Sequence, residues 1–298
     1  MLISKFIDYI QLEKKYSSHT VAAYEGDLLK FKAFCEREFE QDDLSEVHYN
    51  QIRSWIVYMV QDGMTNRSIN RKISSLTSFY KFLLRTQQIQ HSPLAQHKAL
   101  KVAHRVQVPF STEELTRVFE LFESAADFES VRNKLLVEML YSTGMRRAEL
   151  IDLSFSSVDL SNEVVKIRGK RNKERYVPLL PSVQKSIALY LSLRRELAPT
   201  SPHFFVTAKG NKLYATLVYR IINDYFSRVS TKVKKSPHVI RHSFATHLLN
   251  EGADLNSVKE LLGHSSLAST QVYTHSSLSE LKKVYNQAHP RSDKKKDI

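Results

Sequence analysis

Apolar residues recur every three or four positions along the first third of the chain, the spacing of helices that bury one face. The spacing predicts four helices, over residues 2–14, 18–38, 49–61 and 65–86. Gly63 separates the last two, and Thr65 is placed to cap the fourth helix. Cys35 falls on the apolar face of the second helix, where we expect it to be buried. Residues 1–90 are therefore predicted to form a four-helix domain.

This pattern stops over residues 91–109, which have no helical face, so we expect a linker there. Ser111 and Glu114 then form a capping-box pattern that opens a new helix. Alternation in EVVKIRGKRNKERYVPL predicts an antiparallel hairpin around the turn GKRN. Residues 110–290 are predicted to be a mainly helical domain with a small antiparallel sheet, and the charged tail 291–298 to be disordered. Its helices are expected near residues 131–142, 181–197, 214–229, 239–250, 254–261 and 277–287.

Positive charge is distributed unevenly along the chain. The net charge is +13, yet residues 1–50 carry six basic and ten acidic side chains, whereas residues 51–107 carry nine basic and one acidic. Clustered positive charge suits a polyanion, because neutralised phosphates release their counterions. We expect the polar side of the helix over residues 65–86 to contact DNA, with a solvated basic face as the alternative. The basic residues concerned are Arg67, Arg71, Lys72 and Lys81.

Several classes of protein are disfavoured by the sequence. The apolar runs are too short to span a bilayer, and the N-terminus lacks the unbroken apolar core of a signal peptide, so we interpret the chain as cytoplasmic. A single cysteine excludes an intramolecular disulfide framework and a multi-cysteine zinc site. His238 and His242 have metal-ligand spacing, but Arg241 between them disfavours a dication. We expect neither a metal nor a cofactor.

Two arginines stand in unusual local contexts. Gly144 is expected to end a helix in the left-handed conformation, and Arg146 follows on the turn into the next helix. Beyond Pro237, His238 and Arg241 are three residues apart and so share one helical face. An arginine in such a place is more commonly solvated or bound to carbonyl groups. The two become informative only together with further residues.

Those further residues complete a set for metal-free phosphoryl transfer. A tyrosine oxygen such as that of Tyr273 can act as a covalent nucleophile, although a core ring is its more ordinary role. Arginines match the negative charge on the equatorial oxygens of a pentacoordinate phosphorus. A lysine such as Lys170, at the hairpin tip, can protonate a leaving hydroxyl.

Six stretches of the chain carry a resemblance to a known family. Four lie in the second half, TGMRRAEL, GKRNKERYVPL, SPHVIRHSFATHLLNEGADL and LLGHSSLASTQVYTH, and two lie near the N-terminus, SSHTVAAYEGDLLKFKAF and INRKISSLTSFYKFLLR. In order and spacing they resemble the boxes of tyrosine recombinases, the phage integrase family, and are most similar to its XerC/XerD-type site-specific recombinases. The resemblance covers nearly the whole chain. It implies a SAM-like core-binding domain followed by a catalytic domain of the DNA breaking-rejoining fold.

The resemblance also implies a role for each matching residue. Arg146 and Arg241 would clamp the scissile phosphate, and Tyr273 would be the nucleophile. Lys170 would contact a base near the cut and protonate the leaving 5′-oxygen, with Lys173 as the competing hairpin lysine.

Supporting positions match as well, with small departures from the family pattern. His238 and His264 would hydrogen-bond the phosphate or assist proton transfer. Glu149 matches an acidic position that orients the arginine cluster, with a capping or surface charge as the alternative. Met145 stands where leucine is usual, and Arg171 stands where a glycine often follows the hairpin lysine. The second departure puts the turn geometry around that lysine in question.

The implied reaction is conservative strand exchange through a 3′-phosphotyrosyl intermediate, without ATP or metal. The implied assembly on DNA is a homo-tetramer, or a hetero-tetramer with a paralogous recombinase, with a septal DNA translocase as a further partner. Chromosome or plasmid dimer resolution is the expected role, and a phage or mobile-element integrase is the alternative. A non-catalytic architectural DNA-binding protein and a type IB topoisomerase are rivals of other kinds. The helix over residues 277–287 would dock on a neighbouring protomer or pack within its own domain.

Overall fold

The structure is a computed structural model that describes residues 2–103, 107–169, 173–263, 282 and 285–292. The chain divides into two compact units, an N-terminal unit (Met1–Arg105) and a C-terminal unit (Val106–Ile298). Helices dominate both units, and a small antiparallel sheet lies in the second, as the sequence predicted. Within the described ranges, no helix is long and apolar enough to cross a membrane.

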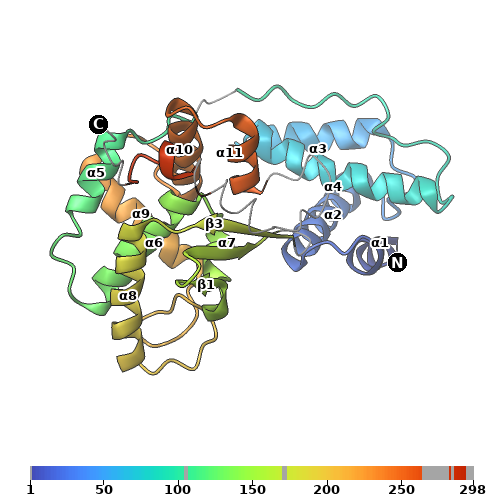
Figure 1. The fold of residues 1–298 in the computed structure, drawn as a ribbon. Helices are drawn as coiled ribbons and strands as arrows, with labels where there is room; N and C mark the ends of the chain where they lie inside the picture. The colour runs from blue at the N-terminus through green and yellow to red at the C-terminus, as the bar shows by residue number, and fades with distance from the viewer. Residues whose placement is uncertain (1, 104–106, 170–172, 264–281, 283–284, 293–298) are drawn as a thin grey trace. The chain divides into compact units, whose positions relative to one another are not determined.

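The N-terminal unit consists of helices whose ends lie close to the predicted ones (Figure 1). They are α1 (Leu2–Asp8), α2 (Ser18–Phe39), α3 (Tyr49–Gln61) and α4 (Asn66–Arg85). The turn that continues α1, Tyr9–Glu13, is π-helical rather than α-helical. Thr65 caps α4 as expected, because its side chain accepts a hydrogen bond from the Ser68 amide at 3.3 Å.

Aromatic side chains build the core of this unit. Phe6 of α1 meets Phe79 of α4 edge to face, with 5.5 Å between ring centroids. Phe31 of α2 packs on Trp55 of α3 at 4.9 Å. Cys35 is fully buried among these helices, which confirms its predicted place. The apolar stripes read from the sequence are therefore the faces on which the helices pack.

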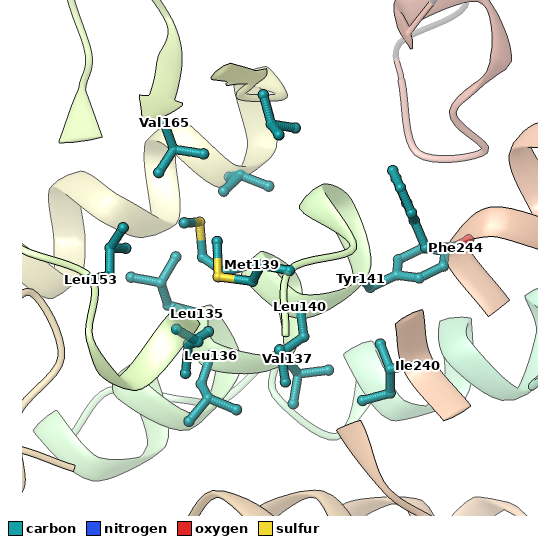
Figure 2. Close-up of a cluster of buried hydrophobic side chains, with 14 of the residues drawn as sticks. Leu135, Leu136, Val137, Met139, Leu140, Tyr141, Leu153, Val165, Ile240 and Phe244 are labelled. Atoms are coloured by element: carbon teal, nitrogen blue, oxygen red, sulfur yellow. The ribbon is translucent and has the colours of Figure 1, made fainter. Parts of the chain in front are cut away.

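The C-terminal unit surrounds helix α6 (Phe128–Thr143), in which every residue from Leu135 to the end is buried. Figure 2 shows Leu135, Met139 and Leu140 of α6 lying between Val165 and Ile240. Helices α8 (Pro181–Glu196) and α10 (Pro237–Asn250) pack against α6. The remaining helices are α5 (Thr112–Glu120), α7 (Arg147–Ile151), α9 (Ala215–Val229) and α11 (Leu255–Leu262), with a short 3-10 turn at Phe155–Ser157.

The sheet contains the predicted hairpin of β2 (Val164–Arg168) and β3 (Glu174–Pro178). A third strand, β1 (Val158–Asp159), pairs antiparallel with β2, and the sequence did not predict it because two residues show no periodicity. In the β2–β3 register Val165 faces Val177, and Ile167 faces Arg175. Directly opposed residues share one face of a sheet, so a charged residue lies on the buried face.

The described C-terminal residues pack within their own unit. Tyr285 is fully buried, and its hydroxyl donates a 2.6 Å hydrogen bond to the Ser142 carbonyl at the end of α6. His289 is fully buried beside it, and the Arg291 guanidinium lies 3.9 Å from the ring centroid of Phe119. Most of the predicted 277–287 helix, and residues 293–298 of the predicted tail 291–298, lie outside the described residues.

Candidate active site

The site begins at the sharp turn between α6 and α7. Gly144 ends α6 with φ 60, as predicted, and a Cβ atom there would lie 2.4 Å from Cδ1 of Phe244. Only glycine fits both the left-handed conformation and this close packing. The turn places Arg146 at the N-cap of α7.

Glu149 holds Arg146 at two points. The Arg146 amide donates to Oε2 of Glu149 and its Nη1 donates to Oε1, both at 2.8 Å. The Arg146 side chain remains 41% exposed, so its guanidinium is fixed on one side and open on the other. Glu149 therefore contacts Arg146, which is the arrangement expected of a carboxylate that orients this arginine.

A second arginine, which the sequence reasoning missed, holds Glu149 from the other side. Arg175 of β3 donates from Nη1 to Oε1 of Glu149 at 3.1 Å and from Nη2 to Oε2 at 2.8 Å. Both side chains are buried. Burial raises the pKa of Glu149, but the hydrogen bonds and charge of Arg175 and the bonds from Arg146 outweigh it, so the pKa lies below its usual value.

Arg241 reaches the same region from α10. Its Nη1 donates to the Gly144 carbonyl, and its Nη2 donates to the Leu262 carbonyl at 2.8 Å. Burial and the positive charges of Arg146 and Arg175 lower the pKa of Arg241 to about 10, so it stays protonated at neutral pH. Two guanidinium groups therefore bind the Glu149 carboxylate, and a third, that of Arg241, is held on backbone carbonyls within electrostatic reach of them, which leaves an excess of positive charge able to receive an anion.

His238 lies one turn before Arg241, and α10 begins at Pro237. Desolvation by the surrounding protein, followed by the positive charges of Arg147, Lys234, Arg241 and Arg146, lowers the pKa of His238. Its imidazole is therefore neutral at neutral pH and can donate or accept a hydrogen bond.

Three predicted site residues, Lys170, His264 and Tyr273, lie outside the described residues. The residues that precede two of them do reach the site. A Cβ atom on Gly169 would lie 3.6 Å from Oε1 of Glu149. Gly263 has φ 66, and a Cβ atom there would lie 3.1 Å from Cδ of Arg175. The described parts of the hairpin and of α11 thus both end beside the Glu149–Arg175 pair.

The predicted DNA-contacting residues of α4 differ from one another in exposure. Arg67, Arg71 and Lys81 are exposed, but Lys72 is buried, which corrects the expectation that it lies on an open basic face. The Lys72 Nζ donates to Oδ1 of Asp27 at 2.8 Å, because helix α2 carries this carboxylate on its inner side. Whether any of these residues contacts DNA stays a prediction.

The arrangement in the C-terminal unit suits the binding of a phosphate diester. Two arginines from α10 and the α6–α7 turn carry the charge, and a neutral histidine stands on the same helix as one of them. Across the part of the chain that the structure describes, no group of three or more His, Cys, Asp or Glu side chains is placed to hold a metal ion.

Comparison with known sequences gives matches along most of the chain. The profile of the phage integrase family matches residues 108–280, and that of the phage integrase N-terminal SAM-like domain matches residues 3–87. Tyrosine recombinase XerC of Anoxybacillus flavithermus is 40% identical, over 97% of this chain and 98% of its own length. Tyrosine recombinase XerC of Bacillus subtilis is 36% identical, over 98% of this chain and 97% of its own length.

Solved structures share the fold. The XerH site-specific recombinase bound to palindromic difH substrate, in a post-cleavage complex, superposes with a TM-score of 0.75 at 22% identity, covering 95% of this chain and 93% of that one. The XerA recombinase superposes with a TM-score of 0.50 at 27% identity, covering 97% and 99%.

Proposed function

The chain belongs to the phage integrase family of tyrosine recombinases, and on that premise we propose that it cuts and rejoins double-stranded DNA at one recombination site through Tyr273. The observation that carries this proposal is the convergence of Arg146 and Arg241 beside Glu149. Two guanidinium groups held in fixed positions suit the phosphorane-like transition state, in which negative charge spreads over the equatorial oxygens. Residues 110–290 would form the catalytic domain, 1–90 the core-binding domain and 91–109 the linker.

In the proposed cleavage step, the Oη atom of Tyr273 gives its proton to His238 or His264 and forms a bond to the scissile phosphorus. The bond from phosphorus to the 5′-oxygen breaks, and Lys170 supplies the proton that makes this oxygen a free 5′-hydroxyl. In the second step a 5′-hydroxyl of the partner duplex gives its proton to Lys170 and attacks the 3′-phosphotyrosyl link, and the released Tyr273 oxygen takes its proton back from the histidine. One phosphoester bond forms for each that breaks, so neither step needs ATP.

The other site residues would act on the phosphate during both steps. Arg146 and Arg241 would bind its non-bridging oxygens through their forked donors. His238 and His264 would hydrogen-bond the phosphate or move a proton. The lowered pKa of His238, caused first by desolvation, supports its part, because a neutral imidazole has one nitrogen free to accept a proton or a hydrogen bond.

The biological role we propose is chromosome or plasmid dimer resolution during chromosome segregation and cell division. It rests on the XerC relatives, which match the chain over nearly their full length. The active assembly would be a homo-tetramer, or a hetero-tetramer with a paralogue, on the DNA site, and a septal translocase would control it. An integrase of a phage or mobile element remains the alternative within the same chemistry.

A covalent capture experiment tests the function. The protein is incubated with a nicked suicide duplex carrying a site that the protein itself selects from fragments of its host genome. We expect a denaturant-resistant protein–DNA adduct whose tyrosine maps to residue 273, and no adduct from Tyr273→Phe. Tyr219→Phe, an exposed tyrosine on α9, is the matched control and should form the adduct normally.

The outcomes separate the rival functions. Specific binding without any adduct would favour an architectural DNA-binding protein. Relaxation of plasmid without a preferred site, by a monomer, would favour a type IB topoisomerase. An adduct formed equally by Tyr273→Phe would disprove the nucleophile.

A further inference from the structure

Arg175 occupies a position where the sheet pattern calls for an apolar side chain. It faces Ile167 across the hairpin and alternates with Val177, so it lies on the face that packs into the core. The residue is 5% exposed. A buried guanidinium is tolerated only where hydrogen bonds replace its lost water. All three of its nitrogens donate hydrogen bonds within the protein.

Those hydrogen bonds tie three segments of the C-terminal unit together. Both terminal nitrogens bind the carboxylate of Glu149 in α7, and Nε donates to the Leu261 carbonyl of α11 at 2.8 Å. Figure 1 shows α11 beside β3, the strand that carries Arg175. The fixed planar fork of arginine can make these three bonds at once, whereas a lysine ammonium cannot reproduce the bidentate pair.

Glu149 transmits this constraint to Arg146. The same two carboxylate oxygens that accept from Arg175 accept from the amide and from Nη1 of Arg146. If Arg175 released the carboxylate, Glu149 would be free to rotate, and the half-exposed Arg146 guanidinium would lose its fixed direction. Groups that act on a transition state depend on supporting contacts of this kind to hold them in place.

We infer that Arg175 is a positioning residue of the strand-cleavage reaction, which fixes the Arg146 guanidinium through the shared carboxylate of Glu149. The inference rests on the proposed function, because it assigns Arg175 a part in that same site. It concerns the rate of the chemical step rather than DNA affinity, because Arg175 is buried and bonded entirely to protein groups.

The test compares two substrates in single-turnover cleavage by Arg175→Lys. One is the nicked duplex with a normal scissile phosphate, and the other carries a methylphosphonate there, which lacks the negative charge that the arginines stabilise. We expect Arg175→Lys to slow cleavage of the normal substrate by about 10- to 100-fold, the usual loss for supporting contacts. On the methylphosphonate substrate we expect the loss to shrink to about threefold or less, because a misdirected Arg146 matters little without that charge. DNA affinity should change by about threefold or less.

Arg132→Lys is the matched control, because Arg132 is also a buried arginine, 2% exposed, at the start of α6 and bonded to Glu129 and Asn133. It should lower thermal stability without distinguishing the two substrates. Glu149→Gln is the second variant should Arg175→Lys fold poorly. It should show the same substrate dependence, and the double variant should be no slower than the slower single variant, since both act through one contact.

Three results would overturn the inference. They are an equal loss on both substrates, a loss no larger than that of Arg132→Lys, or a loss that appears as weaker DNA binding with an unchanged cleavage rate. Failure of the unmodified protein to form any adduct would instead count against the proposed function, so the two failures are distinguishable.

Discussion

Each unit of the molecule contains a buried carboxylate held between two cations, one buried and one largely exposed. In the N-terminal unit Asp27 binds Lys72, whose side chain is 9% exposed, and Arg71, which is 50% exposed. In the C-terminal unit Glu149 binds Arg175, 6% exposed, and Arg146, 41% exposed. Both carboxyl groups have a pKa below the usual value, because hydrogen bonds from the cations outweigh the effect of burial. In each unit, therefore, a buried carboxylate that is paired with a buried cation also fixes one exposed arginine.

The two sites differ in what surrounds the fixed arginine. Asp27 also accepts a hydrogen bond from Ser75 at 2.8 Å, so its cluster is closed within α2 and α4. The Glu149 cluster is joined by Arg241, which is bound to backbone carbonyls and so keeps its full positive charge. In the C-terminal unit, positive charge from several helices and strands surrounds one place and so suits a single phosphate in a transition state. In the N-terminal unit, one exposed arginine on α4 suits a contact to the DNA backbone.

The largest effect that separates the two sites is expected for Arg241→Ala. Cleavage should fall by about a thousandfold or more, because the substitution removes a donor to the transition state, while site binding should stay within a few-fold. Adduct formation and gel-shift titration measure the two quantities. Equal losses of cleavage and of DNA affinity would mean that Arg241 acts in DNA binding, and the two sites would then not differ in role.

In the N-terminal unit the expected effect is on folding rather than on cleavage, and Asp27→Asn should lower the free energy of unfolding. It leaves Lys72 buried without its counterion, which costs about 3 to 5 kcal/mol. The chain has one tryptophan, Trp55, buried in this unit, so its fluorescence during urea unfolding reports the loss. Asp27→Asn combined with Lys72→Met should recover much of the stability, since no charge is then left unpaired. Failure of the double variant to recover would show that shape, not charge, decides the cost.

These clusters also show what the sequence could predict and why. The capping residues follow from local rules, whereas Arg146 and Arg241 were assigned to the site through the family resemblance. The ends of the described helices agree with the predicted ones to within three residues once the π-helical turn Tyr9–Glu13 is counted with α1. Arg175 was missed because KERYV looks like an ordinary polar strand, although its alternation with Val177 places a charge on the buried face. Asp27 carries the same signal, since it falls within the apolar stripe of α2. Pairing such a residue with its partner requires the tertiary structure.

Stability measured as a function of pH should sharpen the comparison, because the buried histidines of the described residues lie in the C-terminal unit. Burial lowers the pKa of His289 to about 3 from its ordinary 6.5, so the unfolded chain binds a proton there that the folded chain does not. Stability of the C-terminal unit therefore falls as the pH falls through this window, by about 2 kcal/mol between pH 6.5 and 5. Burial lowers the pKa of His247 too, which adds in the same direction.

The N-terminal unit should lose less stability over that range, because His97, its described histidine with a pKa lowered by burial, is only half-buried. The lowered pKa of Asp27 means that its contribution is present above the ordinary value of 3.8 and is lost only at lower pH. Trp55 fluorescence and far-UV circular dichroism at pH 6.5 and 5 measure the difference, and His289→Phe should reduce it. If the fluorescence and circular dichroism transitions coincide and shift together with pH, the two units do not unfold separately.

The smallest effect is expected from the two neighbouring cations of α4. Arg71→Ala should weaken DNA binding by a few-fold and lower the slope of affinity against salt by about 1, because one phosphate contact is lost. Lys72→Met is its matched partner and should leave the slope unchanged, since Lys72 is buried against Asp27. Binding titrations from low to moderate salt measure both slopes. An unchanged slope for Arg71→Ala would mean that Arg71 makes no phosphate contact and that Asp27 holds it for the stability of the fold.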